Sequence, residues 1–170
     1  MSLDESSVNL AYTRLYGRAP LNERVCEGVK DVRFERQSIL STIRLNGAMC
    51  PIVFEGTLNK ELFAEYLKTC LKPTLLPNDV VLLDNSSVHK SKLVLETLAE
   101  CGIKHLFLPP YSPDFNPIEL LWAWLKGLLR KMKARTRKKL EKAINHALSE
   151  VELNFIVNWF RHCNVATDIC

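Results

Sequence analysis

Short blocks of hydrophobic residues with strand-like patterning occupy the first two thirds of the chain, separated by turn-forming residues. Asn46-Gly47 between two of these blocks predicts a type I′ hairpin turn, which joins antiparallel strands. The block at residues 80–84 is apolar up to its last residue, as in a strand buried on both faces. The predicted strands are residues 7–16, 37–45, 48–54, 80–84 and 104–108.

Apolar residues at helical spacing lie between and after the later strands. A helix is predicted from a Thr57 cap to about residue 71, and another over residues 91–101, which Gly102 closes. Asn116 and Pro117 suit the N-cap and the first position of a third helix. The last two helices are predicted from their inward-facing residues, which are Leu140, Ala143, Ile144, Ala147 and Leu148 after a Thr136 cap, and then Phe155, Ile156, Trp159 and Phe160.

Three antiparallel strands followed by alternating helices and strands predict an α/β fold, a mixed sheet flanked by helices with right-handed crossovers in its parallel part. The 170 residues suffice for one domain with a sizeable core, and we expect it to span residues 1–170. No apolar run approaches the roughly 18 residues of a membrane span, and the start, MSLDESS, does not resemble a signal peptide. The six cysteines form no CxxC pair and no zinc spacing, so we expect reduced thiols in an intracellular protein of the cytoplasm or nucleoid, without membrane contact.

Two motifs place carboxylates where they suit chemistry. In VVLLDNSSVHKS, Asp84 closes the apolar strand, and open α/β sheets bind ligands at the carboxyl ends of their strands. In LPPYSPDFNPIELLWAWLK, four prolines stiffen the segment that delivers Glu119 to the first turn of a helix. A third candidate, Asp4, lies in LDES at the start. Carboxylates that converge from three elements can hold two divalent cations, which suits the cutting and joining of phosphodiesters.

Each of these residues also has a purely structural interpretation. Asp84 can stabilise the turn that follows it, and Asn116 with Glu119 has the spacing of a capping box. Against the capping box, a helical projection places Glu119 opposite the predicted buried stripe of Leu121, Trp124, Leu125 and Leu128. Asp4 is the weakest candidate from its position alone, because terminal acids are usually solvent exposed.

The motifs LDES, LLDNSSVHKS and LPPYSPDFNPIELLWAWLK, with 34 residues between Asp84 and Glu119, resemble those of DDE transposases of the mariner-like superfamily and of related bacterial insertion-sequence transposases. The resemblance covers nearly the whole chain, because the closing NWFRHCNV is also similar to the end of such domains. It implies an RNase H-like fold, in agreement with the predicted order of elements. It also implies that Asp4, Asp84 and Glu119 are the catalytic and metal-binding carboxylates.

Several neighbours of these carboxylates are candidates for supporting roles. Asn85 and His89 can orient a ligand from the loop after Asp84, or serve only as turn residues. Asn116 is expected to support the helix that carries Glu119. Glu5 is an alternative to Asp4 as a metal ligand, although the motif favours Asp4.

Enzymes of this family cut a phosphodiester at the end of a mobile element and join the freed 3′ hydroxyl to target DNA, a TA dinucleotide if the family rule holds. The resemblance therefore implies two Mg²⁺ ions, with Mn²⁺ as a substitute. It implies DNA as the partner, bound by a homodimer. No covalent protein–DNA intermediate is needed, in keeping with the lack of a recognisable nucleophile motif.

Positive charge is concentrated in residues 126–142, which hold nine Lys and Arg and one acid, while the whole chain carries only +4. A solvated helix face explains most basic runs, and that interpretation stays open. Next to a catalytic helix, however, the run also predicts contacts with phosphates. Trp122 and Trp124 are expected in the core, and Phe115 beside Glu119 is expected to touch DNA. The predicted DNA-binding residues are Tyr111, Lys126, Arg130, Lys131, Lys133, Arg135, Arg137, Lys138 and Lys139.

The chain departs from the family pattern at its start. Only three residues precede Asp4, so most of the first, central strand is expected to be missing, and so is the helix-turn-helix domain that such proteins carry upstream. That domain is then expected to be joined by frameshifting or supplied in trans, and the isolated chain to be a weak enzyme with a mobile N-terminus. A nuclease that only hydrolyses DNA, and a non-catalytic DNA-binding remnant, stay open as alternatives.

Overall fold

The computed structural model describes residues 1–26, 28 and 36–165. Its described strands form one mixed sheet in the order β3-β2-β1-β4-β5, with β1 at the centre. β1 pairs antiparallel with β2, and β2 with β3, whereas β4 and β5 continue the sheet in parallel to β1. The predicted mixed α/β sheet is confirmed. The strands are β1 (Ser2–Asn9), β2 (Arg36–Ile43), β3 (Ile52–Glu55), β4 (Val81–Leu83) and β5 (His105–Phe107).

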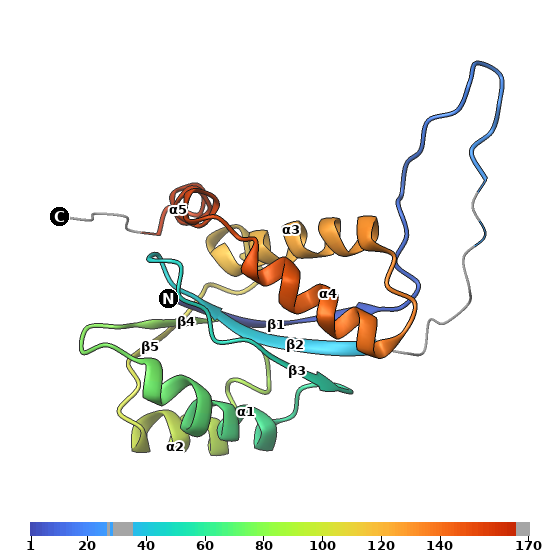
Figure 1. Ribbon diagram of the computed structural model, residues 1–170. Coiled ribbons are helices and arrows are strands. Elements are labelled where there is room, and N and C mark those ends of the chain that lie inside the picture. Colours follow the sequence, from blue (N-terminus) through green and yellow to red (C-terminus); the bar gives the residue numbers. More distant parts are fainter. Residues whose placement is uncertain (27, 29–35, 166–170) are drawn as a thin grey trace.

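Helices cover both faces of the sheet, with α1 and α2 on one face and α3, α4 and α5 on the other (Figure 1). The predicted starts of α3, α4 and α2 are correct, and Gly102, at a φ of 66°, follows α2 as expected. The helices are α1 (Lys60–Tyr66), which runs on into a π-helical turn (Leu67–Leu71) and a 3₁₀ turn (Lys72–Thr74), α2 (Lys92–Glu100), α3 (Pro117–Met132), α4 (Arg137–Ser149) and α5 (Leu153–His162).

Each helical layer encloses its own hydrophobic core, and β1 contributes to both. Val8 packs into the core under α3 and α4, whereas Leu3 packs into the core under α1 and α2. Because side chains alternate along a strand, the even-numbered side chains of β1 face α3 and the odd-numbered ones face α1 and α2. This alternation puts Asp4 on the α3 side and Glu5 on the opposite side.

The first strand differs from its prediction. It begins at Ser2 and ends at Asn9, and it pairs with β2 over that whole length, so the expectation that most of this strand is missing is wrong. The run Asp4 to Ser7 is entirely polar, and it concealed the strand because it breaks the hydrophobic pattern. Parallel pairing with β4 is confined to Ser2↔Leu82, beside a hydrogen bond of 2.8 Å from the Leu82 N–H to the Met1 carbonyl.

Two local predictions are also corrected. The hairpin turn is closed by a hydrogen bond from the Gly47 N–H to the Arg44 carbonyl, and Asn46 lacks the positive φ that a type I′ turn requires. Gly47, with a φ of 90°, instead supplies the left-handed residue after the turn. The N-cap of α1 is Asn59 rather than Thr57, because the Asn59 side chain reaches the Leu62 N–H at 2.8 Å.

The buried stripe of α3 is rotated slightly from its predicted position. Trp122 is 1% exposed, whereas Trp124 and Leu128 are only partly buried, so Trp122 rather than Trp124 anchors the helix. Within the described residues, no helix is long and apolar enough to cross a membrane. The cysteines in that part of the chain are free thiols, namely Cys26, Cys50, Cys70, Cys101 and Cys163.

Arg135 ties the turn between α3 and α4 to the segment that follows β1. Its Nη1 donates hydrogen bonds to the carbonyl oxygens of Leu10 at 2.9 Å and Tyr12 at 2.7 Å. Nearby, the Arg130 guanidinium lies 5.1 Å from the centre of the Tyr12 ring. Part of the basic segment therefore serves the fold, and Arg135 is a weaker candidate for DNA contact than its charge suggested.

Replacing Arg135 with alanine should destabilise the protein by about 1–3 kcal/mol, because two hydrogen bonds from a charged donor are lost. Urea unfolding at fixed pH measures this change. Lys131→Ala, an exposed cation on the preceding helix, is the matched control and should change stability by less than about 0.5 kcal/mol. Equal effects of the two substitutions would show that the Arg135 contacts contribute nothing.

Candidate active site

The predicted carboxylates come from three elements that meet at one end of the sheet. If the Ser2↔Leu82 pairing is continued by two residues, Asp4 lies opposite Asp84, the residue directly after β4. Glu119 lies in the first turn of α3, on the side of the sheet that Asp4 faces. The fold therefore directs all three side chains toward the same region.

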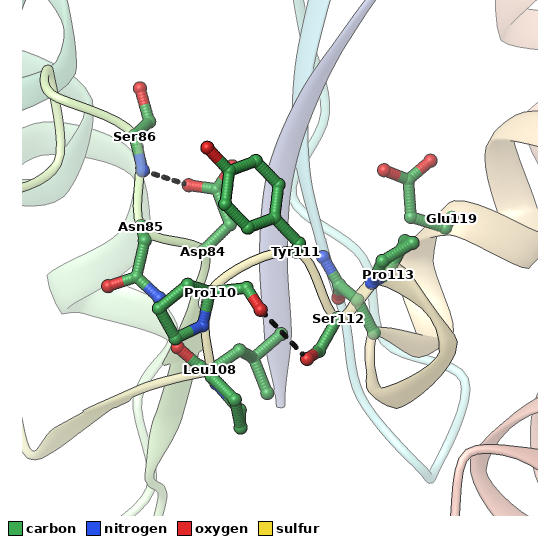
Figure 2. A pocket seen from close by; sticks show the side chains of 11 residues that line it. Asp84, Asn85, Ser86, Leu108, Pro110, Tyr111, Ser112, Pro113 and Glu119 are labelled. Carbon is green, nitrogen blue, oxygen red and sulfur yellow. Dashed lines mark hydrogen bonds between the residues drawn. The ribbon is translucent and has the colours of Figure 1, made fainter.

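A cavity of about 470 Å³ opens at this end of the sheet, between the loops that follow β4 and β5. Asp84 and Glu119 both line it, and Figure 2 shows them on two sides of it with Tyr111 between them in this view. Asp4 lies beneath, with only 6% of its surface exposed, whereas the Asp84 side chain is 45% exposed. The other lining residues are Asn85, Ser86, Leu108, Pro109, Pro110, Tyr111, Ser112, Pro113 and Asn116.

Asp4 is an acid in an unfavourable environment for its charge. Burial raises the pKa of Asp4 to about 7, and the neighbouring charges of Glu5, Glu119 and Asp84 act in the same direction. A hydrogen bond of 2.7 Å from the Glu5 N–H to Asp4 Oδ1 opposes them. The carboxylates are thus close enough to repel one another, and a cation among them would remove that cost.

Hydrogen bonds from His89 and the Ser86 N–H stabilise the anionic form of Asp84. The hydrogen bond from His89 is the largest influence on Asp84 and lowers the pKa of its carboxyl, and the Ser86 N–H adds a second hydrogen bond at 3.0 Å. His89 Nδ1 lies 2.5 Å from Asp84 Oδ1. Burial lowers the pKa of His89, but Asp84 and Glu5 outweigh burial and raise it to about 9.

The two asparagines of the predicted site hold its framework together. Asn116 Oδ1 accepts a hydrogen bond from Ser2 Oγ, which joins the start of α3 to the start of β1. Asn85 Nδ2 donates to the Leu108 carbonyl, which joins the chain after β4 to the chain after β5. Neither contact is local in sequence, and both tie together elements that carry carboxylates or line the cavity.

The capping-box interpretation of Glu119 is wrong. The Asn116 side chain caps no N–H of α3, and the Asn116 N–H donates to the Pro113 carbonyl at 2.9 Å. Glu119 is exposed, and its carboxylate is therefore available to the cavity. Sequence analysis did not predict a role for Ser2, and it considered Glu5 only as an alternative metal ligand. Ser2 and Glu5 contact residues more than 80 positions away, and no local pattern reports such contacts.

Some of the predicted DNA-binding residues lie near Glu119, and the others lie at the far end of α3 or on α4. Tyr111 is fully exposed beside the cavity at a φ of 55°, and Phe115 is 44% exposed. Lys126 and Arg130 share the α3 face of Glu119, and Lys131 follows them. By contrast, Arg137 donates to Glu55 Oε1 at 2.5 Å. Lys133, Lys138 and Lys139 lie at the far end of α3 from Glu119 and on the first turn of α4.

The chemistry of the carboxylates fits a hard divalent cation, which prefers oxygen ligands. As they stand, no three His, Cys, Asp or Glu side chains among the described residues are close enough to share one metal ion. Asp84 and Glu119 are accessible side chains at the cavity, whereas Asp4 is buried. His89 and the Ser86 N–H hold the Asp84 carboxylate in place.

Comparisons with known proteins agree with this geometry. Residues 1–141 match the family described as DDE superfamily endonuclease. An RNase H-like nuclease domain is thus the class that fold and site define, and this chain belongs to the DDE superfamily of endonucleases. None of the curated proteins compared with the chain matches its sequence significantly.

Solved structures of Mos1 transposase share the fold at low sequence identity. The Mos1 strand transfer complex is 17% identical with a TM-score of 0.78, over 94% of this chain and 50% of the Mos1 chain. The Mos1 paired end complex with Mn is 14% identical with a TM-score of 0.76, over 94% and 51%. The Mos1 catalytic domain with raltegravir and Mg is 16% identical with a TM-score of 0.71, over 94% and 75%. This chain spans about half the length of the Mos1 chains in the two complexes.

Replacing Asp4 with asparagine should stabilise the metal-free protein. Because the folded-state pKa of Asp4 is raised to about 7 from 3.8, ionisation costs the folded state stability as pH rises through that interval. Asp4→Asn avoids this cost, so its advantage should grow between pH 4 and pH 7 and reach about 4 kcal/mol above pH 7. Urea unfolding in EDTA across this range measures the difference. A pH-independent difference between the two proteins would contradict the assigned environment of Asp4.

Proposed function

We propose that this chain is the catalytic domain of a DNA transposase, which cleaves phosphodiesters at the ends of a mobile element and joins them to target DNA. The observation that carries the proposal is that Asp84, directly after β4, and Glu119 of α3 line one cavity, with the charges of both acting on buried Asp4 of β1. Membership of the DDE superfamily and the likeness to a strand transfer complex support this function. We also propose that the whole protein binds the ends of the mobile element and inserts them at a TA dinucleotide in the target DNA.

Asp4, Asp84 and Glu119 would hold two Mg²⁺ ions, or Mn²⁺ in their place, in keeping with the Mg and Mn bound by Mos1. The bound ions would act as Lewis acids toward the scissile phosphate. Asp4 supplies a fixed carboxylate from the rigid centre of the sheet, and Glu119 an adaptable one from α3. The anionic form of Asp84 is maintained by His89, so this ligand needs no deprotonation near neutral pH.

DNA would approach along the α3 face that carries Glu119. Lys126 and Arg130 extend this face away from the cavity, and at 1.5 Å per residue Arg130 lies about 16 Å from Glu119 along the helix. A phosphodiester backbone laid on α3 would meet these cations in succession. A second cavity of about 360 Å³ continues the path and is lined by Arg14, Leu15, Tyr16, Gly127, Arg130 and Lys131. A homodimer on DNA, and an upstream recognition domain in cis or in trans, complete the proposal.

Strand transfer tests this function most specifically. A duplex that ends in a free 3′ hydroxyl of the element is incubated with the protein, Mg²⁺ and a supercoiled target plasmid. Joined products are expected, because the 3′ hydroxyl can take the place of water at the same site. Cleavage without any joining, under conditions where the end is bound, would reduce the activity to that of a hydrolytic nuclease.

Removal of either accessible carboxylate should abolish catalysis but not binding. Asp84→Asn or Glu119→Gln should lower Mg²⁺-dependent cleavage by about two to three orders of magnitude, the equivalent of several kcal/mol of transition-state stabilisation. DNA affinity in EDTA should be unchanged or higher, because one repulsive charge is lost. Glu96→Gln, on the exposed surface of α2, is the control for cleavage rate and gel-shift affinity. Near wild-type cleavage by a site variant would exclude that residue.

Neutral substitutions of Lys126, Arg130 and Lys131 should weaken binding to every duplex alike. The slope of log K against log salt should fall by roughly 0.9 for each phosphate contact that is lost. The matched control removes the same charge from the opposite face, by substitution of Lys60, Lys68 and Lys92 on α1, its π-helical extension and α2. Equal slopes for the two triple variants would return the α3 cations to the status of a solvated face.

A further inference from the structure

Asp4 and Asp84 lie where the pairing between β1 and β4 ends. Backbone pairing between β1 and β4 is confined to Ser2↔Leu82, and Asp4 and Asp84 lie two residues beyond it. Both side chains carry negative charge when ionised, and the other carboxylates raise the cost of ionising Asp4.

His89 lies directly beneath this gap. Its side chain is fully buried, and its ring centre lies 4.4 Å from that of Phe63 of α1, with the two ring planes tilted by 34°. One ring nitrogen, Nδ1, is 2.5 Å from Asp84 Oδ1, and the other, Nε2, is 3.5 Å from Glu5 Oε2. Glu5 belongs to β1 and Asp84 follows β4, so the ring spans the two strands.

The contact between His89 and Glu5 involves two buried polar atoms that face each other. His89 Nε2 and Glu5 Oε2 are both inaccessible and have no other hydrogen-bond partner among the described residues. Buried polar atoms are costly to leave unpaired. A shift that shortens their separation from 3.5 Å to about 3 Å would satisfy both.

The alternation of β1 excludes Glu5 from the role of Asp4. Consecutive residues of a strand point to opposite faces, so Glu5 points toward α1 and α2 while Asp4 points toward α3. The contact of Glu5 with buried His89 lies on the α1 and α2 side, away from α3 and Glu119. Glu5 is therefore poorly placed to bind a cation with Asp4, and its carboxylate is directed at His89 instead.

We propose that Glu5, His89 and Asp84 form a side-chain bridge between β1 and β4, which sets the position and orientation of the Asp84 carboxylate relative to Asp4. The assignment of Asp84 as a catalytic residue rests on the proposed function, and the bridge gives Glu5 and His89 the role of positioning residues. His89 Nδ1–H donates to Asp84 and Nε2–H donates to Glu5. Partners that orient a ligating carboxylate typically contribute about 10- to 100-fold in metal affinity or activity.

Glu5→Met tests the bridge, because it keeps the length of the side chain and removes the acceptor. It should lower kcat for DNA cleavage by about tenfold or more, with KM for DNA unchanged, when measured at a temperature well below the unfolding midpoint of the variant. Glu5→Gln, which retains an acceptor oxygen, should recover part of the rate. Glu100→Met, which removes a surface carboxylate that pairs with Lys68 at 3.3 Å, is the control. A wild-type kcat in Glu5→Met would overturn the proposal.

A double substitution shows whether Glu5 acts through His89. If it does, Glu5→Met combined with His89→Gln should be no slower than His89→Gln alone. Multiplied effects would mean that Glu5 acts independently, for instance as a metal ligand, and would refute the bridge. Should His89→Gln fail to fold, Glu5→Met and Glu5→Gln decide the question through kinetics and the NMR measurement below.

NMR tests the bridge without catalysis. In ¹⁵N-labelled protein the ring N–H signals of His89 are identified by comparison with His89→Gln or, failing that, by their correlation with the Phe63 ring. The Nε2–H should be protected from solvent exchange, lost or exposed in Glu5→Met and retained in Glu100→Met. An Nε2–H that is unaffected by Glu5→Met would refute the bridge. A protected, Glu5-dependent Nε2–H in a protein that cleaves no DNA would uphold the bridge and refute the proposed function.

Discussion

Repulsion between like charges is the constraint on which this site depends. Asp4, Asp84 and Glu119 must lie near one another to share cations. In the metal-free protein, burial raises the pKa of Asp4 to about 7, and the nearby carboxylates of Glu5, Glu119 and Asp84 act in the same direction. The fold counters the repulsion with ties between the elements that carry the carboxylates. Ser2 and Asn116 join β1 to α3, Asn85 and Leu108 join the ends of β4 and β5, and His89 lies between Asp84 and Glu5. These ties stabilise an arrangement that the carboxylates alone would disrupt.

The central strand distributes these roles through its alternation. Its even-numbered residues include Ser2 and Asp4, which face α3 and the candidate site. The odd-numbered Leu3 and Glu5 face the opposite side, where Leu3 packs in the core under α1 and α2 and Glu5 lies near His89. A strand with polar residues on both faces is costly unless each polar group finds a partner. For Ser2 and Glu5 of β1, the partners Asn116 and His89 lie far away in the sequence. The central position of β1, with antiparallel pairing to β2 along its whole length, makes this tolerable.

Local signals account for what the sequence predicted correctly. The helix starts near Ser91, Asn116 and Thr136 and the apolar face of α4 depend on neighbours within a few residues, and the structure agrees with them, although only Thr136 caps its helix through its side chain. Hydrophobic pattern failed at β1, where Asp4 to Ser7 are polar, and at α3, where tertiary packing buries Trp122 more deeply than Trp124. The contact between Ser2 and Asn116 joins residues 114 positions apart and has no local trace. Charge alone likewise could not show that Arg135 holds the fold together through hydrogen bonds to Leu10 and Tyr12, whereas Lys126 lies on the helix face of Glu119.

Cation binding by Asp4, Asp84 and Glu119 together is the central proposal for this protein. Anomalous diffraction from crystals grown with Mn²⁺ tests it directly, because the ion is located without reference to activity. We predict Mn²⁺ in contact with all three carboxylates, with the Glu119 side chain turned toward Asp4 and Asp84, and loss of this density in Glu119→Gln. Mn²⁺ bound elsewhere, or no ordered Mn²⁺ at a saturating concentration, would contradict the claim.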